Sequence, residues 1–269
     1  MSEQVETLAT RGDVVLSGRG ICKSYGSRGG KRAERHQVLF DVDVDVYAGE
    51  CLAVIGGSGS GKSTLTRILL GLEPADSGTI TYRGAVVQRH NAAARVLQHD
   101  SGLVYQNPFS SIDPRWTVGD TVAEPLLIRA GKRSTVLGTV YETLARVGLD
   151  PVEFIDRYPM QLSGGQAQRV AIARAIVTEP TVILADEPMS AIDVPSRLQI
   201  LRTFDLIRKV RPETALIMVS HDLGVVQHIA DRVLVLHDGR LVETGSTTDV
   251  LEHPRDEYTK RLIDAASLS

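Results

Sequence analysis

Cysteine is almost absent from this sequence of 269 residues, which contains only Cys22 and Cys51. Two thiols are too few for a disulfide framework of the kind that stabilises small secreted domains. Both lie in apolar, strand-like segments. We therefore predict two reduced structural thiols that take no part in chemistry.

Long apolar runs are absent as well. A membrane-spanning helix needs about 20 predominantly apolar residues, whereas the longest apolar runs here have the length of a strand: residues 51–57, 181–185, 215–219 and 233–236. The first dozen residues contain acidic groups and no apolar stretch, unlike a secretory signal. We expect residues 1–12 and 266–269 to be flexible tails and the chain to stay in the cytoplasm.

An excess of charge of one sign is also missing, because 30 Lys and Arg face 33 Asp and Glu, a formal net charge of −3. A protein that binds nucleic acid through its overall field needs a basic balance. We therefore expect no nucleic-acid partner. With 42% hydrophobic and 23% charged residues, the composition is that of an ordinary globular protein.

The order of apolar patterns predicts an α/β fold. Short β-type runs between Val14 and Val46 flank a basic, glycine-containing interruption, residues 26–37. We interpret it as an exposed hairpin tip, with contact to anionic lipid or an acidic partner as the alternative. Residues 117–158 have helical periodicity, whereas three later apolar strands alternate with helical segments. This alternation is typical of a parallel sheet with crossover helices.

A phosphate-binding pattern follows the apolar strand CLAVI. The segment GGSGSGKS fits G-x-x-x-x-G-K-[ST], and Leu65, Ile68, Leu69 and Leu72 after it predict one apolar helix face. Glycines let backbone N–H groups approach phosphate oxygens, and the helix adds its positive N-terminal dipole. The predicted nucleotide-binding residues are Gly56, Gly57, Ser58, Gly59, Ser60, Gly61, Lys62, Ser63 and Thr64. Lys62 is expected to reach the β and γ phosphates and Ser63 to bind Mg²⁺.

Two carboxylates end the apolar strand VILADE. This position is where parallel α/β sheets bind their ligands. We predict that Asp186 holds Mg²⁺ through its water shell and that Glu187 orients the attacking water or accepts its proton.

A second candidate anion site lies in LSGGQ, residues 162–166. Ser163 and Gln166 have the spacing of a capping box, which explains a well-capped helix. A capping box does not explain the paired glycines Gly164 and Gly165. They remove side chains from a helix N-terminus, which makes it a surface that can bind an anion. Since the chain already has a phosphate-binding loop, a second cradle implies a second protomer.

These motifs together resemble the nucleotide-binding subunit of an ATP-binding cassette (ABC) transporter, over roughly Val14 to Thr259. The resemblance implies a P-loop core with a parallel sheet, an antiparallel β subdomain and a helical subdomain at about 113–165, within a domain of residues 13–265. It implies ATP and Mg²⁺ as cofactors. It further assigns Tyr25 to adenine stacking, Gln106 to Mg²⁺ and the attacking water, Asp193 to the D-loop and His221 to the γ-phosphate.

In this family two cassettes pair head to tail, so the resemblance implies a second ABC subunit, identical or different, as partner. It also implies permease subunits in the membrane, indirect contact with an extracytoplasmic solute-binding protein, and a peripheral position on the cytoplasmic face of the membrane. The catalytic residues it implies are Glu187, His221 and Gln106.

The segment YQNPFSSIDPRWTVGDTVAEPL is similar to the importer branch for di- and oligopeptides and nickel. The tail EHPRDEYTKRLIDA resembles the branch's His-Pro-Tyr-Thr region, although Arg255, Asp256 and Glu257 separate Pro254 from Tyr258. The alternatives are a soluble ABC ATPase without transport, such as a cassette that accompanies phosphonate breakdown, and a kinase-type P-loop enzyme.

Overall fold

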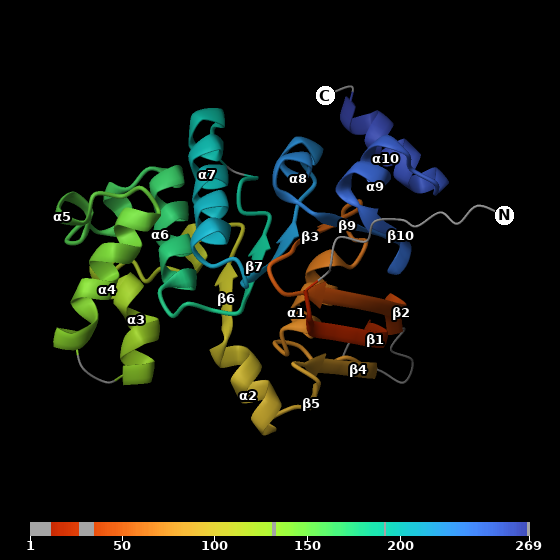
Figure 1. Cartoon of the computed structure of the whole chain (residues 1–269), viewed down its shortest axis with the longest axis horizontal. Coiled ribbons are helices and arrows are strands. Elements are labelled where there is room, and N and C mark those ends of the chain that lie inside the picture. Colours follow the sequence, from red (N-terminus) through yellow and green to blue (C-terminus); the bar gives the residue numbers. More distant parts are fainter. Residues whose placement is uncertain (1–11, 27–34, 131–132, 191, 268–269) are drawn as a thin grey trace.

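The computed structural model describes residues 12–26, 35–130, 133–190 and 192–267. Most of the basic interruption and nearly all of the N-terminal tail predicted above lie outside the described residues. Two sheets form the framework (Figure 1). One is antiparallel with the order β2-β1-β4-β5, and the other has six strands in the order β10-β9-β3-β8-β7-β6.

The antiparallel sheet contains β1 (Val14–Gly26), β2 (Arg35–Tyr47), β4 (Ser77–Tyr82) and β5 (Ala85–Val87). The predicted interruption at 26–37 was too wide, because Gly26 pairs with Arg35 and Ser24 with Gln37. Cross-strand pairing satisfies backbone groups that a loop would leave to water. Strands β4 and β5 form a hairpin, turned at Arg83 and Gly84, both with positive φ.

The six-stranded sheet forms the centre of the molecule. Its parallel strands are β3 (Cys51–Ile55), β6 (Ser101–Val104), β7 (Val182–Asp186), β8 (Ala215–Val219) and β9 (Arg232–His237). The edge strand β10 (Arg240–Ser246) runs antiparallel to β9. All five side chains of β3 and of β8 are buried, as their unbroken apolar sequences require in a sheet covered on both faces.

Helices cover the sheet and build a separate lobe. Near the phosphate loop lies α1 (Lys62–Leu69), and α2 (Ala92–His99) precedes β6. The lobe contains α3 (Val118–Ala130), α4 (Arg133–Arg146) and α5 (Pro151–Phe154), with the 3-10 turns η1 (Pro108–Ser110) and η2 (Pro159–Gln161) at its borders. Then follow α6 (Gly164–Ile176), α7 (Val194–Val210), α8 (Leu223–Ile229), α9 (Thr247–Glu252) and α10 (Glu257–Ser267).

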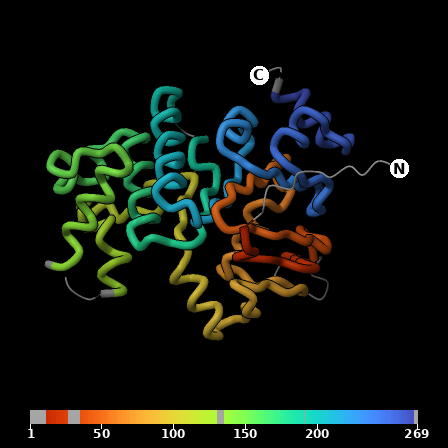
Figure 2. Tube along the Cα trace, viewed as in Figure 1, coloured from red at the N-terminus to blue at the C-terminus, as the bar shows by residue number. Residues whose placement is uncertain are grey.

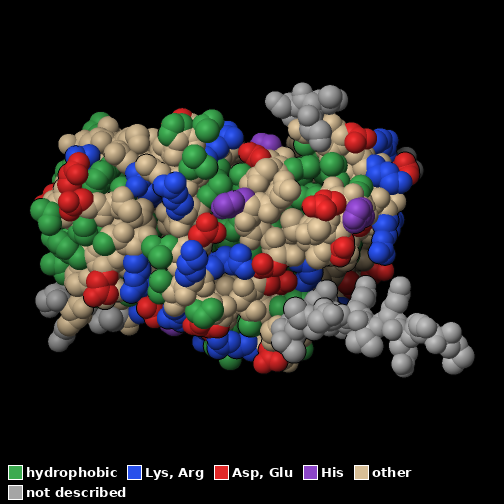
Figure 3. All heavy atoms as spheres, turned by 45° about the horizontal axis from the view of Figure 1, so that its top comes forward, with side chains coloured by type: hydrophobic (Ala, Val, Ile, Leu, Met, Phe, Trp, Pro, Cys, Tyr) green, Lys and Arg blue, Asp and Glu red, His purple; other side chains and the backbone are tan. Residues whose placement is uncertain are grey.

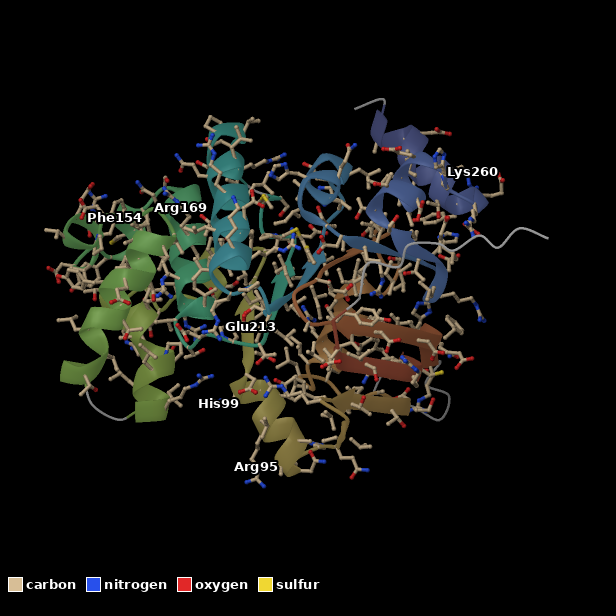
Figure 4. All side chains as sticks on the ribbon, in the orientation of Figure 1. Arg95, His99, Phe154, Arg169, Glu213 and Lys260 are labelled. Carbon is tan, nitrogen blue, oxygen red and sulfur yellow. The ribbon has the colours of Figure 1, made fainter. Side chains whose placement is uncertain are left out.

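The helical lobe arises from the middle of the chain, whereas the first third of the chain and its C-terminal part, drawn in blue, share the other half of the molecule (Figure 2). On α6, Arg169 donates to the carbonyl oxygen of Gly148 at 2.8 Å and so ties this helix to the lobe that contains Phe154 (Figure 4). Burial lowers the pKa of the Arg169 guanidinium. The long α6 therefore belongs to the core and to the lobe at once.

The apolar face predicted for α1 is partly wrong. Leu65, Ile68 and Leu69 are fully buried, each worth about 1.5–3 kcal/mol of hydrophobic stabilisation. Leu72 is 45% exposed because α1 ends at Leu69 and Gly71, with φ of 66°, turns the chain away. Within the described residues, no helix has both the length and the apolar character needed to cross a bilayer.

Candidate nucleotide site

The phosphate loop lies between β3 and α1, as its sequence context predicted. Its glycines are required by shape. A Cβ on Gly56, whose φ is 148°, would lie 2.1 Å from the carbonyl oxygen of Leu236, and one on Gly61, whose φ is 99°, would lie 2.8 Å from Leu39 Cδ2. Both positions therefore exclude any side chain.

Lys62 stands at the centre of this loop. Its side-chain Nζ donates to the carbonyl oxygens of Gly56 at 2.9 Å and Gly57 at 2.8 Å, and the residue is only 8% exposed. Burial lowers the pKa of the ammonium, opposed by the charges of Glu187 and Asp186. A buried cation surrounded by glycine backbone at a helix N-terminus is a cradle that fits a polyphosphate.

Four elements, α1, β6, β7 and β8, bring the predicted metal and catalytic residues to one place. Ser63 Oγ lies 3.3 Å from Asp186 Oδ1 at the end of β7. Gln106, after β6, donates from Nε2 to Glu187 Oε2 at 3.2 Å and to Ser190 Oγ at 3.1 Å. His221, after β8, places Nδ1 3.5 Å from the same Glu187 oxygen.

The two adjacent carboxylates differ in their surroundings. Burial raises the pKa of Asp186, although the hydrogen bond from Ser63 opposes the shift. Glu187 has a φ of 47°, uncommon for a residue other than glycine, and its N–H donates to the carbonyl oxygen of Val219 at 2.9 Å. Such strained backbone is concentrated at functional sites, where the surrounding fold enforces it.

Part of this group, including Lys62 and Ser63 but not Asp186 or Gln106, lines a cleft of about 550 Å³. Glu187, His221 and Tyr25 border it together with most of the phosphate loop. Tyr25, which is 43% exposed, lies 3.4 Å from Thr64 through its hydroxyl. His36 also lines the cleft, a position that no sequence motif indicated. The residues that form this lining include none of the LSGGQ segment and not Asp193.

The LSGGQ residues lie instead at the start of α6. Ser163 Oγ accepts from the Gln166 N–H at 3.3 Å, and the Ser163 N–H donates to Gln166 Oε1 at 2.8 Å, which is the predicted capping box. Ser163 and Gly164 are exposed, whereas a Cβ on Gly165 would lie 2.6 Å from Ser196 Cβ on α7. Ser163 and Gly164 at this helix N-terminus therefore face solvent.

Asp193 precedes α7 and is exposed, without a side-chain hydrogen bond that caps this helix. The neighbouring Arg197 donates from Nε to the carbonyl oxygen of Ile192 at 2.8 Å and lies 3.4 Å from Asp222, next to His221. The start of α7 after Asp193 is thus tied to the segment that carries His221.

Sequence reasoning missed Gln168, which connects two of the motifs. This fully buried side chain on α6 donates from Nε2 to the carbonyl oxygen of Tyr105 at 3.2 Å, directly before Gln106. A second hollow, of about 590 Å³, lies beside this region and is formed by residues 110–116 together with Glu124 and Arg174. Glu124 and Arg174 form an ion pair at 2.6 Å.

Comparison with known proteins places these features in a family. The sequence model described as "ABC transporter" matches residues 39–190. The chain belongs to the ABC transporter family. It is therefore an ATP-hydrolysing, ATP-binding subunit of a transporter, and the alternative of a cassette without transport is not supported. The expected fold, a P-loop core with a β subdomain and inserted helices, is confirmed as well.

Relatives of this ABC protein include two ATP-binding subunits. The chain is 41% identical to the oligopeptide transport ATP-binding protein OppF of Lactococcus lactis, over 83% of this chain and 70% of that protein. It is 41% identical to the di/tripeptide transport ATP-binding protein DppF of Pseudomonas aeruginosa, over 94% and 79%. Among solved structures, the dimeric, post-hydrolysis ATP-binding cassette MJ0796 bound to ADP and Pi has a TM-score of 0.75 and 27% identity, over 86% and 98%.

Proposed function

We propose that this subunit drives the import of di- and oligopeptides from a position on the cytoplasmic face of the membrane. The observation that carries the substrate class is the 41% identity to the oligopeptide and di/tripeptide transport ATP-binding proteins over most of the chain. The extracytoplasmic solute-binding protein would deliver the peptide to the permease and contact this subunit indirectly.

Within one chain, the cleft binds ATP against the phosphate loop, with Tyr25 beside the adenine and Lys62 at the phosphates. Ser63 and Asp186, 3.3 Å apart, fit a Mg²⁺ ion with Gln106 nearby, because a hydroxyl, carboxylates and phosphates are its usual ligands. The bound metal would neutralise charge that develops on the phosphates. Glu187 orients the attacking water and accepts its proton, and His221 faces the γ-phosphate.

The exposed start of α6 supplies the second half of the site to a partner cassette, identical or different. Ser163 and Gly164, exposed at a helix N-terminus, fit an anion, and the chain's own nucleotide cleft is lined by other residues. A head-to-tail pair places each LSGGQ segment against the other chain's ATP, with Asp193 at the junction. The dimeric structure of the similar cassette MJ0796 supports the pairing of two cassettes.

The permease docks at the hollow formed by residues 110–116, Glu124 and Arg174. Trp116 in its lining is 38% exposed and the preceding Phe109 is 46% exposed, as expected of residues that a partner covers. Gln106 and Gln168 connect this region to Glu187 and to α6, so closure of the nucleotide site is transmitted to the membrane.

Uptake measurements test the substrate class. In a strain without other peptide importers, deletion of this gene is expected to abolish uptake of labelled dipeptide and tripeptide. The wild-type gene restores uptake and Glu187→Gln does not. Radioactive nickel is measured in parallel, because nickel is the other cargo of this branch. Unchanged peptide uptake in the deletion strain, with loss of nickel uptake, would contradict the proposal.

A further inference from the structure

A tyrosine from the far end of the chain touches the phosphate loop. Tyr258 lies in α10, and its hydroxyl accepts a hydrogen bond from the Gly57 N–H at 2.7 Å across a sequence separation of 201 residues. The Tyr258 ring stacks on His237 at the end of β9, with centroids 3.6 Å apart and planes inclined by 17°. Lys260 marks the same helix in Figure 4.

The start of α10 is held in place without help from the loop. Asp256 Oδ1 accepts from the Tyr258 N–H at 2.8 Å, which caps the helix. The Glu243 carboxylate accepts from the N–H groups of Arg255 at 2.8 Å and Asp256 at 3.1 Å. Because these bonds and the His237 stack fix the ring, the hydroxyl meets the loop from a preset position.

The bond acts on a particular peptide unit. The Gly57 N–H and the Gly56 carbonyl belong to one planar amide, so fixing the direction of the N–H also fixes the direction of the oxygen. That oxygen accepts from Lys62 Nζ at 2.9 Å. A Cβ on Gly57 would lie 3.0 Å from the Tyr258 hydroxyl oxygen, so the two residues are closely fitted.

We propose that Tyr258 is a positioning residue of the nucleotide site: its hydroxyl fixes the Gly56–Gly57 peptide and, through it, the Lys62 ammonium. The C-terminal helix thereby sets nucleotide affinity. This inference rests on the nucleotide-binding role of the loop. It assigns Tyr258 no contact with ATP and no part in the chemical step, because Glu187 and His221 lie on other elements.

The test compares two deletions of a tyrosine hydroxyl in the full-length chain. Tyr258→Phe keeps the ring and removes the acceptor for Gly57. Tyr82→Phe is the matched control, because the Tyr82 hydroxyl donates to Asp100 Oδ2 at 2.9 Å away from the cleft. The Kd for MgADP is measured by calorimetry, and KM and kcat for MgATP by steady-state hydrolysis.

Tyr258→Phe is expected to raise Kd and KM about tenfold, since the partly buried Gly57 N–H would lose its partner and its fixed direction. We expect kcat to change by less than about twofold, because saturating nucleotide restores the bound geometry. Tyr82→Phe should leave Kd and KM unchanged. His237→Ala, which loosens the ring and keeps the hydroxyl, should raise Kd about threefold.

A wild-type Kd in Tyr258→Phe would overturn the proposal. A fall in kcat with unchanged KM, or an equal loss of affinity in Tyr82→Phe, would also overturn it. His237→Ala remains informative if Tyr258→Phe does not fold, since an unchanged Kd there contradicts the positioning role. Failure of the wild-type chain to bind MgADP would instead contradict the nucleotide site itself.

Discussion

The phosphate loop and the LSGGQ segment are both glycine-rich helix N-termini. They differ in whether other groups of the same chain complete the binding site around them. Lys62 is buried and bonded to two carbonyls of its own loop, and Tyr258 supports the loop from behind. Ser163 and Gly164 are exposed, and the hydrogen bonds of Ser163 go to Gln166 in the same turn. One site is assembled within the chain, whereas the other is presented to solvent.

This difference separates two kinds of function. Substitutions at the phosphate loop should impair nucleotide binding by an isolated chain. Substitutions at the start of α6 should leave that binding intact and impair only steps that need two cassettes. Figure 3 shows acidic and basic side chains interspersed on the visible face. This is expected if ligands bind at separate local sites and not through one large charged surface.

The largest effect is expected at Glu187, which belongs to the complete site. Glu187→Gln keeps the size of the side chain and an oxygen that can accept from Gln106, but removes the proton acceptor. We expect kcat to fall at least about a hundredfold with nucleotide affinity unchanged. Phosphate release measures the loss, and Glu213→Gln, at an exposed carboxylate labelled in Figure 4, is the control. Turnover near the wild-type rate would exclude Glu187 as the base.

Lys62→Ala tests the same site through binding. Hydrogen bonds from a charged donor contribute about 1.5–3 kcal/mol, so affinity for MgADP should fall roughly ten- to a hundredfold. Calorimetry of the isolated chain measures it, with the exposed Lys209→Ala as control. Equal affinities in the two variants would contradict the assignment of the phosphate loop.

Gly164→Asp tests the exposed LSGGQ segment. A Cβ there would meet only Ile192 Cδ1 at 3.7 Å, an ordinary contact, and an acidic residue is favourable at a helix N-terminus. Its charge would repel a partner's nucleotide, so turnover should fall about tenfold while MgADP affinity of the lone chain stays constant.

The control for this variant is Gly138→Asp on the exposed surface of α4, where a Cβ would have open space. It should leave turnover unchanged. A loss of lone-chain nucleotide affinity in Gly164→Asp would show that α6 belongs to its own chain's site, and the contrast between the two halves would disappear.

The smallest effect is a pH-dependent change in stability at Asp186. Because burial raises its pKa in the folded chain, the folded state holds the proton more tightly than the unfolded state. Stability is therefore lost as pH rises through the unfolded pKa and the raised folded pKa. Asp186→Asn should raise the Tm of the nucleotide-free chain by about 2 °C at neutral pH. The difference should vanish in acid, and a lower Tm at neutral pH would contradict this origin.

How well a site residue could be predicted depends on how far apart in the sequence it and its partners lie. The phosphate loop, the carboxylate pair and the capped start of α6 are visible in sequence because their constraints are local: positive φ, close backbone approach and capping. Gln168 and Tyr258 were missed as site residues because their partners lie 63 and 201 residues away. Only the folded topology places β9 and α10 behind the loop.

The fold was predictable to a similar degree. The buried strands and the capped α5, which begins after Asp150, follow from apolar runs and a local signal. The ends of elements were less certain from sequence. Leu72 continued the helical period, but Gly71 ended α1 before it. The hairpin strands continued through polar residues such as His36, which pairs with Tyr25, because pairing is decided across the sheet.

The central claim is that ATP joins two cassettes through the exposed LSGGQ segment. The most direct test measures the molar mass of Glu187→Gln by light scattering, with saturating MgATP, alone and mixed with a cognate cassette. We predict a stable particle of two cassettes. Adding Gly164→Asp to this chain should abolish the particle, and in a mixed pair the matching glycine of the partner cassette is changed as well. A single-cassette mass under all these conditions would contradict the account.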